Sequence, residues 1–249
     1  MRKALQRRLL KRTTLIRETL SRKAAWSSYV IFALLSCGTS LSFASGSQCF
    51  GSTKKGSIQG AVQLPAQGEN FIQYSQIARA AGRTYVHSVV RDIVVASYQQ
   101  LATSHPDKVF KYAETGLAEG GLFKPHKTHQ NGLSIDFMTP VTNAQGQSVN
   151  LPTLLTNRWG YDIEFNDNSQ YKDLTIDYEA MAAHIVALHQ QSKALGYDLW
   201  RVIFDPKLQP NLYKTSYASY LKENIQFSTK RSWVRHDEHY HVDFAVPCK

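Results

Sequence analysis

The stretch at residues 239–246, His-Tyr-His-Val-Asp-Phe-Ala-Val, decides the fold that we expect for this chain. Its pattern predicts a final strand. In a strand, successive side chains point to opposite faces, so residues i and i+2 share one face. His239 and His241 would then point the same way and lie close together. Two imidazoles side by side on a rigid strand suit one metal ion, or one ligand beside one acid/base group.

A second segment, upstream, carries matching chemistry. Residues 133–138, Leu-Ser-Ile-Asp-Phe-Met, alternate in the way that is typical of a strand. Asp136 lies in this strand and His129 in the loop before it, with Gly132 allowing a sharp turn between them. One histidine, one carboxylate and one further histidine form the ligand set that zinc accepts in a catalytic site, where water takes the fourth position.

The rest of the chain mixes helical and extended patterns without βαβ regularity. Apolar spacing and capping signals predict helices over residues 85–101, 176–195 and 212–223. Strands are expected over residues 109–113 and 199–204, and the polar residues 141–172 are interpreted as a long connection with little regular structure. These patterns predict an α+β fold, a single domain in which helices flank a central antiparallel β-sheet and the metal site lies on the sheet.

The charge is concentrated in a leader. Of the net charge of +10, residues 1–23 contribute nine basic residues and one acidic residue, and residues 24–44 contribute none, which leaves about +2 for the remainder. The basic character therefore gives no reason to expect nucleic-acid binding. The uncharged stretch ends in Ser42-Phe43-Ala44, a small-x-small pattern that suits signal peptidase. We expect residues 1–44 to be a signal peptide and the domain at 45–249 to be exported.

Two alternatives for the leader stay open. Residues 34–37, Leu-Leu-Ser-Cys, resemble the motif in which the cysteine is lipidated, and the apolar stretch could also remain as an uncleaved anchor. Cleavage after Ala44 would remove Cys37 and leave Cys49 and Cys248, one near each end of the mature chain. In an oxidising compartment these two could form a disulfide, the alternative being two unpaired thiols.

The two histidine segments together resemble a known family. His129-Gln-Asn-Gly-Leu-Ser-Ile-Asp136 and His239-Tyr-His241 stand in this order, and each is preceded three residues earlier by another histidine, His126 and His236. This arrangement resembles the penicillin-insensitive murein endopeptidases, within the zinc peptidases that include lysostaphin-type and D-Ala-D-Ala peptidases. That group pairs an upstream His…Asp motif with a downstream HxH or ExH motif. The resemblance covers roughly residues 47–249 and includes Gly120-Gly121, the segment 201–206 and Cys248.

The resemblance implies a zinc metallopeptidase domain over residues 45–249, with zinc on His129, Asp136 and His241. It also implies that His239 is the acid/base group. The related ExH arrangement has a carboxylate at this position, where it can take a proton from water, and a neutral imidazole can do the same near pH 7. The remaining two histidines, His126 and His236, would flank the site and stabilise an oxyanion or hold the ligands by hydrogen bonds.

The implied reaction is zinc-dependent hydrolysis of peptide cross-links in peptidoglycan, at the D-alanyl–meso-diaminopimelyl bond, in the periplasm. The implied partners are the cross-linking peptides, with no nucleic acid, and with membrane contact only through the signal or a lipid anchor at Cys37. Three alternatives remain: an exported wall-binding zinc protein without hydrolytic activity, a D,D- or L,D-carboxypeptidase on wall peptides, and a peptidase for a non-wall peptide.

Several other polar and aromatic residues have weaker signals. Asp243 shares the predicted strand face with His239 and His241, and could either orient an imidazole or be an ordinary solvated carboxylate. We interpret Asp237 and Glu238 as surface charges. Isolated histidines are expected on the surface or satisfied in the core, and the aromatic residues near the motifs are expected in the core or lining a cleft. These are His87, His105, His184 and His189, and Trp159, Tyr161 and Tyr240.

Overall fold

The computed structural model describes residues 46–249 except 231 and 233. The expected signal peptide over residues 1–44, with the alternative lipid anchor at Cys37, lies outside the described residues. Within the described part of the chain, no helix combines the length and apolar character needed to cross a bilayer.

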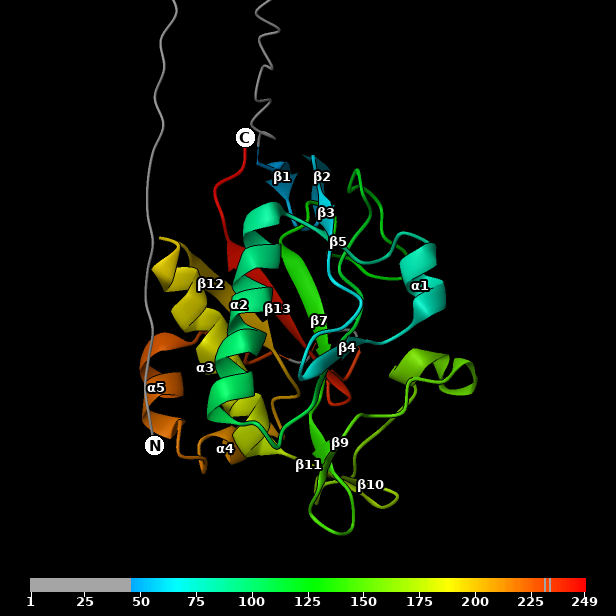
Figure 1. Ribbon diagram of the computed structural model, residues 1–249, viewed down its shortest axis with the longest axis vertical. Helices are drawn as coiled ribbons and strands as arrows, with labels where there is room; N and C mark the ends of the chain where they lie inside the picture. The colour runs from blue at the N-terminus through cyan, green and yellow to red at the C-terminus, as the bar shows by residue number, and fades with distance from the viewer. Residues whose placement is uncertain (1–45, 231, 233) are drawn as a thin grey trace, which may run out of the picture. The chain divides into compact units, whose positions relative to one another are not determined.

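A five-stranded sheet forms the centre of the fold, in the order β12-β13-β7-β6-β4 (Figure 1). Its strands are β4 (Phe71–Gln73), β6 (Phe110–Tyr112), β7 (Ser134–Met138), β12 (Asp198–Ile203) and β13 (His239–Ala245). The strands predicted at 109–113, 133–138, 199–204 and 239–246 are therefore all present, with bounds shifted by a residue or so.

The α+β prediction is confirmed, with one difference in the sheet. All neighbouring pairs of the central sheet are antiparallel except β4 and β6, which run parallel with Phe71 opposite Phe110. Between β4 and β6 the chain passes through α1 (Gln76–Ala80), β5 (Tyr85–Val86) and α2 (Ser88–Ser104). Because a long crossover containing a helix returns the chain to the same end of the sheet, the next strand enters in parallel.

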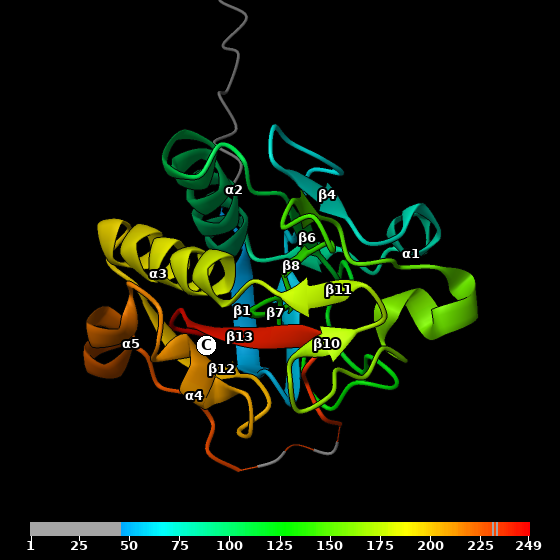
Figure 2. The same cartoon turned by 90° about the horizontal axis from the view of Figure 1, so that it is seen from below.

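The two long helices cover one face of this sheet (Figures 1 and 2). They are α2 and α3 (Tyr178–Ala194), and they confirm the helices predicted over residues 85–101 and 176–195, except that α2 begins three residues later than predicted and Tyr85 and Val86 form β5. Asp177 caps α3 by accepting from the backbone N–H of Ala180 at 3.0 Å. Gly196 follows the helix with φ of 80°, a conformation that glycine adopts without steric cost.

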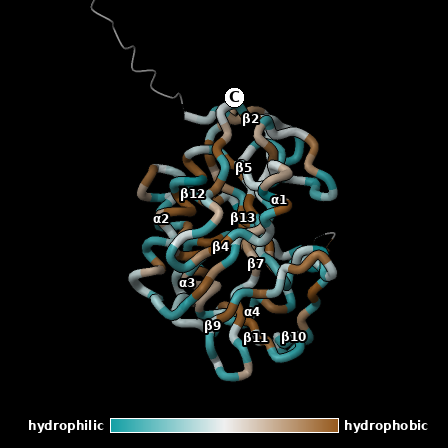
Figure 3. The backbone as a smooth tube through the Cα atoms, turned by 45° about the vertical axis from the view of Figure 1, so that its right-hand side comes forward, coloured by the Kyte–Doolittle hydropathy of each residue, from teal (hydrophilic) through white to brown (hydrophobic). Residues whose placement is uncertain are grey.

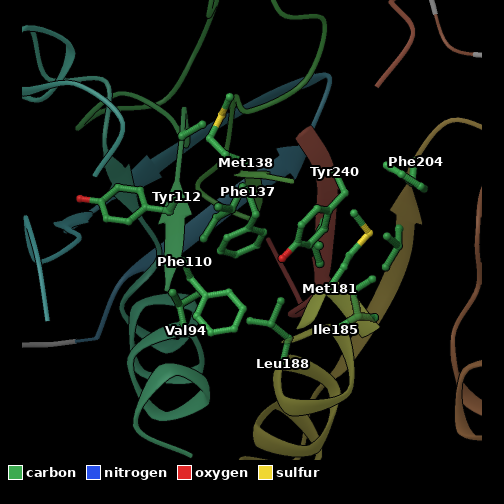
Figure 4. Packing of buried hydrophobic residues seen from close by; sticks show 14 of the residues in the cluster. Val94, Phe110, Tyr112, Phe137, Met138, Met181, Ile185, Leu188, Phe204 and Tyr240 are labelled. Carbon is green, nitrogen blue, oxygen red and sulfur yellow. The ribbon is translucent and has the colours of Figure 1, made fainter. Parts of the chain in front are cut away.

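The core lies between these helices and the sheet (Figure 4). Ile185 and Leu188 of α3 point towards Phe137 of β7 and Tyr240 of β13 in this view. His184 is also buried here, where its ring stacks on Tyr98 with centroids 4.8 Å apart. Because side chains alternate along a strand, the residues next to Phe137 in β7 and next to Tyr240 in β13 face the other side of the sheet.

Smaller elements surround the central sheet. Two of them are pairs of strands from the first part of the described chain. β1 (Gln48–Ser52) and β2 (Lys55–Gln59) form a hairpin, and β3 (Val62–Gln63) pairs with β5. The disulfide between Cys49 and Cys248, which the sequence left open, is present, with Cα atoms 4.8 Å apart. It joins β1 to the C-terminal segment, and the backbone pairs there as well, with the N–H of Gly51 donating to the carbonyl of Lys249 at 2.9 Å.

Residues 141–172 are mostly irregular, as expected, but they contain several short elements. The strands β8 (Val141–Thr142), β9 (Ser148–Val149) and β10 (Gln170–Tyr171) form a four-stranded sheet with β11 (Leu174–Ile176), and the 3-10 helix η1 (Leu155–Gly160) lies between β9 and β10. These strands have two or three residues each, which is too few for a periodic signal in the sequence. The turn beside β9 is largely hydrophilic (Figure 3).

The helix predicted over 212–223 is divided into α4 (Gln209–Leu212) and α5 (Ala218–Asn224). Between them, the hydroxyl of Thr215 donates to the carbonyl of Leu212 at 2.7 Å. Such a local side-chain bond competes with the helical hydrogen bond that would continue α4.

Candidate metal centre

The strand register brings the two histidine segments together. In the antiparallel pair of β7 and β13, His241 stands opposite Asp136 and His239 opposite Met138. Phe137 and Tyr240 point to the side of α2 and α3 (Figure 4), so the buried side chains of Asp136, His239 and His241 lie on the opposite face of the sheet. The i, i+2 spacing expected for the last strand therefore places both imidazoles beside one carboxylate.

The loop before β7 folds back through a position that only glycine fits. Gly132 has φ of 76°, and a Cβ there would lie 2.8 Å from the backbone nitrogen of His87 and 2.6 Å from Ile58 Cδ1. His129 itself has φ of 69°, an uncommon left-handed conformation for a residue with a side chain. Such strain persists only where the surroundings hold it, and it is often found at functional sites.

The ring of His129 is oriented from behind. Its Nδ1–H donates to the carbonyl of Thr115 at 2.9 Å, which leaves Nε2 without a proton. That Nε2 is buried without a hydrogen-bond partner and lies 3.3 Å from Asp136 Oδ1. Two buried acceptors facing each other are unfavourable unless a cation lies between them.

Asp136 is the shared centre of these contacts. Burial alone would raise its pKa, but the interactions with the surrounding histidines, among them the hydrogen bond from His241, outweigh burial and hold the pKa well below its ordinary value, so the carboxylate is ionised. Its Oδ2 accepts from the hydroxyl of Tyr161 at 3.0 Å. Among the described residues, His126, His129 and Asp136 form a group whose potential ligand atoms all lie within 4.8 Å of one another. This group could hold a metal ion.

His241 joins the same carboxylate from the neighbouring strand. Its Nδ1 lies 2.8 Å from Asp136 Oδ1, and its Nε2 lies 2.9 Å from Asp243 Oδ1. Burial lowers the pKa of His241, but Asp243 and Asp136 outweigh burial and raise it to about 10. Asp243 is itself held by Arg201 Nε at 2.6 Å and by the hydroxyl of Ser134. Asp243 therefore orients an imidazole, one of the two roles left open for it.

The sequence profile of the penicillin-insensitive murein endopeptidases matches residues 49–249. The chain belongs to this family. The resemblance seen in the two motifs is thereby confirmed, and the protein is a murein endopeptidase by family, with peptidoglycan peptides as the implied substrates. None of the curated proteins compared with the chain matches it.

The other two histidines of the endopeptidase motifs also reach the site. His239 directs Nδ1 to Glu238 Oε1 at 2.7 Å, and its Nε2 lies 3.8 Å from Asp136 Oδ2. His236 packs against His239 with ring centroids 4.5 Å apart and bonds the carbonyl of Val234 through Nδ1. Burial is the main cause that lowers the pKa of His239 to about 4 and that of His236 to about 3, so both rings are neutral near pH 7.

The charges that precede His239 are not at the surface, contrary to the sequence interpretation. Asp237 and Glu238 are buried. Burial raises the pKa of Asp237 to about 7 and that of Glu238 to about 8. Charged residues are usually exposed, which is why sequence reasoning placed them outside, but here Glu238 holds the His239 ring and Asp237 accepts from the backbone of Phe165 at 2.6 Å.

Sequence reasoning missed one segment of the endopeptidase site altogether. Directly after β6, the carbonyl of Glu114 accepts from the backbone N–H of Asp136 at 2.9 Å, and the carbonyl of Thr115 holds the His129 ring. The Glu114 carboxylate contacts Nε2 of His126. No local motif marks these residues, because their partners lie 12 to 22 positions further along the chain.

A cavity of about 850 Å³ opens over these groups. Its lining includes His126, His236, Glu238, His239 and His241. One wall comes from η1, where Arg158 and Trp159 have left-handed φ values of 50° and 57°, followed by Tyr161. Trp159 and Tyr161 therefore line the cleft, whereas Tyr240 lies in the core. The other isolated histidines do not line this cavity; His87, His184 and His189 are buried.

Proposed function

We propose that the protein cuts the D-alanyl–meso-diaminopimelyl cross-links of peptidoglycan with zinc held by His129, Asp136 and His241. The observation that carries the proposal is the buried, unpartnered Nε2 of His129 facing the ionised Asp136. A divalent cation between them would satisfy both groups. The donor set of two imidazoles and one carboxylate suits zinc and leaves a position for water.

His241 is suited to be the third ligand through Nδ1. Its Nε2 faces Asp243, which Arg201 neutralises in turn. Histidine ligands of metals commonly donate their second ring N–H to a carboxylate in this way, which fixes the tautomer and the ring orientation. Once Nδ1 has lost its proton, its lone pair would point towards Asp136 Oδ1. His129 Nε2 faces the same oxygen, so both histidines could bind one metal ion there.

The proposed catalytic residues surround that point. When bound, zinc supplies Lewis-acid chemistry that activates water and polarises the scissile carbonyl. His239, whose Nδ1 is held by Glu238, directs Nε2 into the site and would take the proton from the attacking water. It would then return that proton to the leaving amine. His126 and His236 would flank the scissile bond. Their ring protons are held by Glu114 and by the carbonyl of Val234, so in the neutral rings the other nitrogen is an acceptor that would take a hydrogen bond from the substrate.

The charge of the cavity supports an anionic peptide substrate. Its lining contains seven Lys and Arg side chains and four Asp and Glu side chains. This local excess exceeds the charge of about +2 on the whole chain after residue 44. Lys54 and Lys124 have no acidic partner among the residues that the structure describes. Stem peptides of peptidoglycan carry free carboxylates, which these ammonium groups could bind.

The proposed place of action is the periplasm, after removal of residues 1–44. The disulfide between Cys49 and Cys248 is consistent with an oxidising compartment. It also bears on the wall-binding alternative. Structural zinc sites are usually closed by four protein ligands, often thiolates, but both of these thiols are used in the disulfide.

One alternative ligand set has support of its own. His126 rather than His241 completes the group of mutually close ligand atoms with His129 and Asp136. In that arrangement His241 would remain a charged bridge between Asp136 and Asp243. The two sets differ in which histidine the metal requires, so metal content of single variants separates them.

The reaction is tested by digestion of purified, cross-linked muropeptides with added zinc or with a chelator, read by mass spectrometry. Conversion of dimers to monomers, abolished by the chelator, supports the endopeptidase. Release of only a terminal D-alanine would instead identify a carboxypeptidase. Bound zinc without any cleavage would favour the wall-binding protein or a non-wall peptide substrate.

A further inference from the structure

A buried carboxylate outside both histidine motifs contacts the metal-binding group. Glu114 follows β6 and is only 7% exposed. Its position is set by the β6–β7 ladder, which continues past β6: Ala113 N–H donates to the carbonyl of Asp136 at 2.7 Å, and Asp136 N–H donates to the carbonyl of Glu114 at 2.9 Å. Glu114 is therefore fixed beside Asp136 by the backbone, before any side-chain contact is considered.

The Glu114 carboxylate accepts from three side chains. The hydroxyl of Tyr74 donates to Oε1 at 2.8 Å, Arg83 donates through Nε and through Nη2, the latter at 2.9 Å, and Nε2 of His126 contacts Oε2. Burial raises the pKa of Glu114, but His126 and Arg83 outweigh it and lower the pKa to about 2. An ionised carboxylate can only accept, so the proton of the contact with His126 is on Nε2.

Arg83 is braced in turn. Its guanidinium lies over the ring of Phe123, 4.0 Å from the centroid, and donates to the carbonyl of Lys124 at 3.0 Å. Both contacts are to the loop that carries His126. Glu114 and Arg83 thus hold the side chain of His126 and the loop before it as one unit, with two parallel bonds between guanidinium and carboxylate.

The consequence appears at the other nitrogen of His126. With Nε2 bound to Glu114, Nδ1 is the atom that turns to the metal-binding group, 3.6 Å from Asp136 Oδ2. If the ring turned over, Nε2 instead of Nδ1 would face the metal-binding group. The lone pair or proton on that side of the ring would then stand in a different place. A carboxylate behind an imidazole commonly controls the orientation of the ring at a metal site in this way, and its loss costs about 10- to 100-fold in activity or metal affinity.

We propose that Glu114 is a positioning residue that fixes the His126 ring with Nδ1 towards the metal-binding group, and that Arg83 holds Glu114 in place. The inference rests on the proposed function in one respect: an effect on the reaction requires that His126 acts on the substrate. The orientation of the ring is a property of the protein alone, so it can be tested without turnover.

The first test is long-range 1H–15N NMR on the metal-free protein, which reads the protonation of each ring nitrogen of His126. In the wild type we expect the proton of the neutral ring on Nε2, where it is bound to Glu114. In Glu114→Ala the proton should distribute between both nitrogens. An unchanged Nε2–H signal in a folded Glu114→Ala protein would overturn the proposal, whatever the enzyme cleaves.

The second test is kinetic. Glu114→Ala should lower kcat on cross-linked muropeptides by about 10- to 100-fold with bound zinc retained and with KM changed less than about threefold. Added formate or acetate, which can enter the vacated space, should restore part of kcat. A purely structural effect would not respond to the added carboxylate. Glu114→Gln, which keeps the volume, should also lose kcat and serves if the alanine variant does not fold.

Asp177→Ala is the matched control, because Asp177 is also a buried carboxylate paired with a cation, Lys108 at 3.0 Å, but it caps α3 away from the cavity. It should keep wild-type kcat and show no response to formate. If Glu114→Ala keeps kcat within about twofold of wild type, Glu114 does not position a residue that takes part in the reaction. If the wild type itself cleaves nothing, the proposed function fails, and the NMR result alone decides the role of Glu114.

Discussion

His241 stands directly opposite Asp136 across the β7–β13 pair, with Nδ1 and Oδ1 2.8 Å apart. This single cross-strand contact joins two motifs more than a hundred residues apart in sequence. It lies on the face of the sheet away from the helices, where the central strands expose polar groups to the cavity instead of to the core. The placement of Asp136 beside His241 is thus a direct result of strand register.

The proposed role of His239 predicts that a variant without this imidazole binds metal but has low activity. Removing the imidazole in His239→Ala removes the proposed proton acceptor without touching the proposed ligands. We expect kcat to fall by about 10²- to 10⁴-fold, the usual contribution of general acid–base catalysis, while zinc stays bound. Steady-state kinetics and zinc content on the same preparation check this. Loss of zinc from the variant would show that His239 is a ligand instead.

The unpaired lysines of the cavity predict a dependence on substrate charge. Lys54→Gln and Lys124→Gln should each raise KM for stem peptides with free carboxylates by about two- to fivefold, the size of one partly solvated ion pair. The effect should shrink with added salt and with amidated substrates. Lys55→Gln is the control, since Lys55 is exposed on the same hairpin but does not line the cavity. Equal effects at Lys54 and Lys55 would contradict a specific contact.

His184 predicts acid sensitivity of the fold. Burial lowers its pKa to about 3 from an ordinary value of 6.5, so the folded protein keeps it neutral. Below pH 6.5 the unfolded chain binds the proton more readily, and stability falls as the pH falls towards 3, by up to about 1.4 kcal/mol per pH unit from this group.

The variant His184→Leu removes this titration. It also removes the contact of His184 with the hydroxyl of Tyr240, a loss that does not depend on pH. Denaturant unfolding at several pH values should therefore show a shallower decline for the variant than for the wild type between pH 6.5 and 4. Parallel declines would mean that His184 does not control the acid response.

The disulfide predicts a stability difference between redox states. Cys49 and Cys248 close a loop of 199 residues, and the entropy lost by such a loop in the unfolded chain corresponds to about 5 kcal/mol. Guanidinium unfolding with and without a reductant should show a loss of this order on reduction. The double variant with both cysteines changed to serine should match the reduced protein. No change on reduction would show that the backbone hydrogen bonds of Lys249 with Gly51 and Cys49 suffice to hold the termini.

Much of this architecture could be predicted from local pattern. The i, i+2 histidines of β13, the alternating β7 and the apolar spacing of α2 and α3 each carry their own signal over five or more residues. The sharp turn at Gly132 followed from the residue type, and its crowded surroundings confirm that no side chain fits there.

The rest depends on tertiary contacts that no local pattern records. Glu114 matters because Arg83 and His126, from two other segments, meet it in space. Glu238 is an acid beside a histidine, and only the burial of β13 shows that it faces inward. The parallel strand β4 has three residues, and its partner β6 is reached only after a long crossover. Pairing of this kind is determined by the assembled fold.

The most direct test of the account is the zinc content of purified single variants after dialysis against zinc and removal of the excess. We predict about one zinc per chain in the wild type, in His239→Ala and in His126→Ala, and little in His129→Ala, Asp136→Ala and His241→Ala. Zinc retained by His241→Ala and lost from His126→Ala would contradict the proposed ligand set and assign the third position to His126. A wild type that binds no zinc would contradict the metal centre itself.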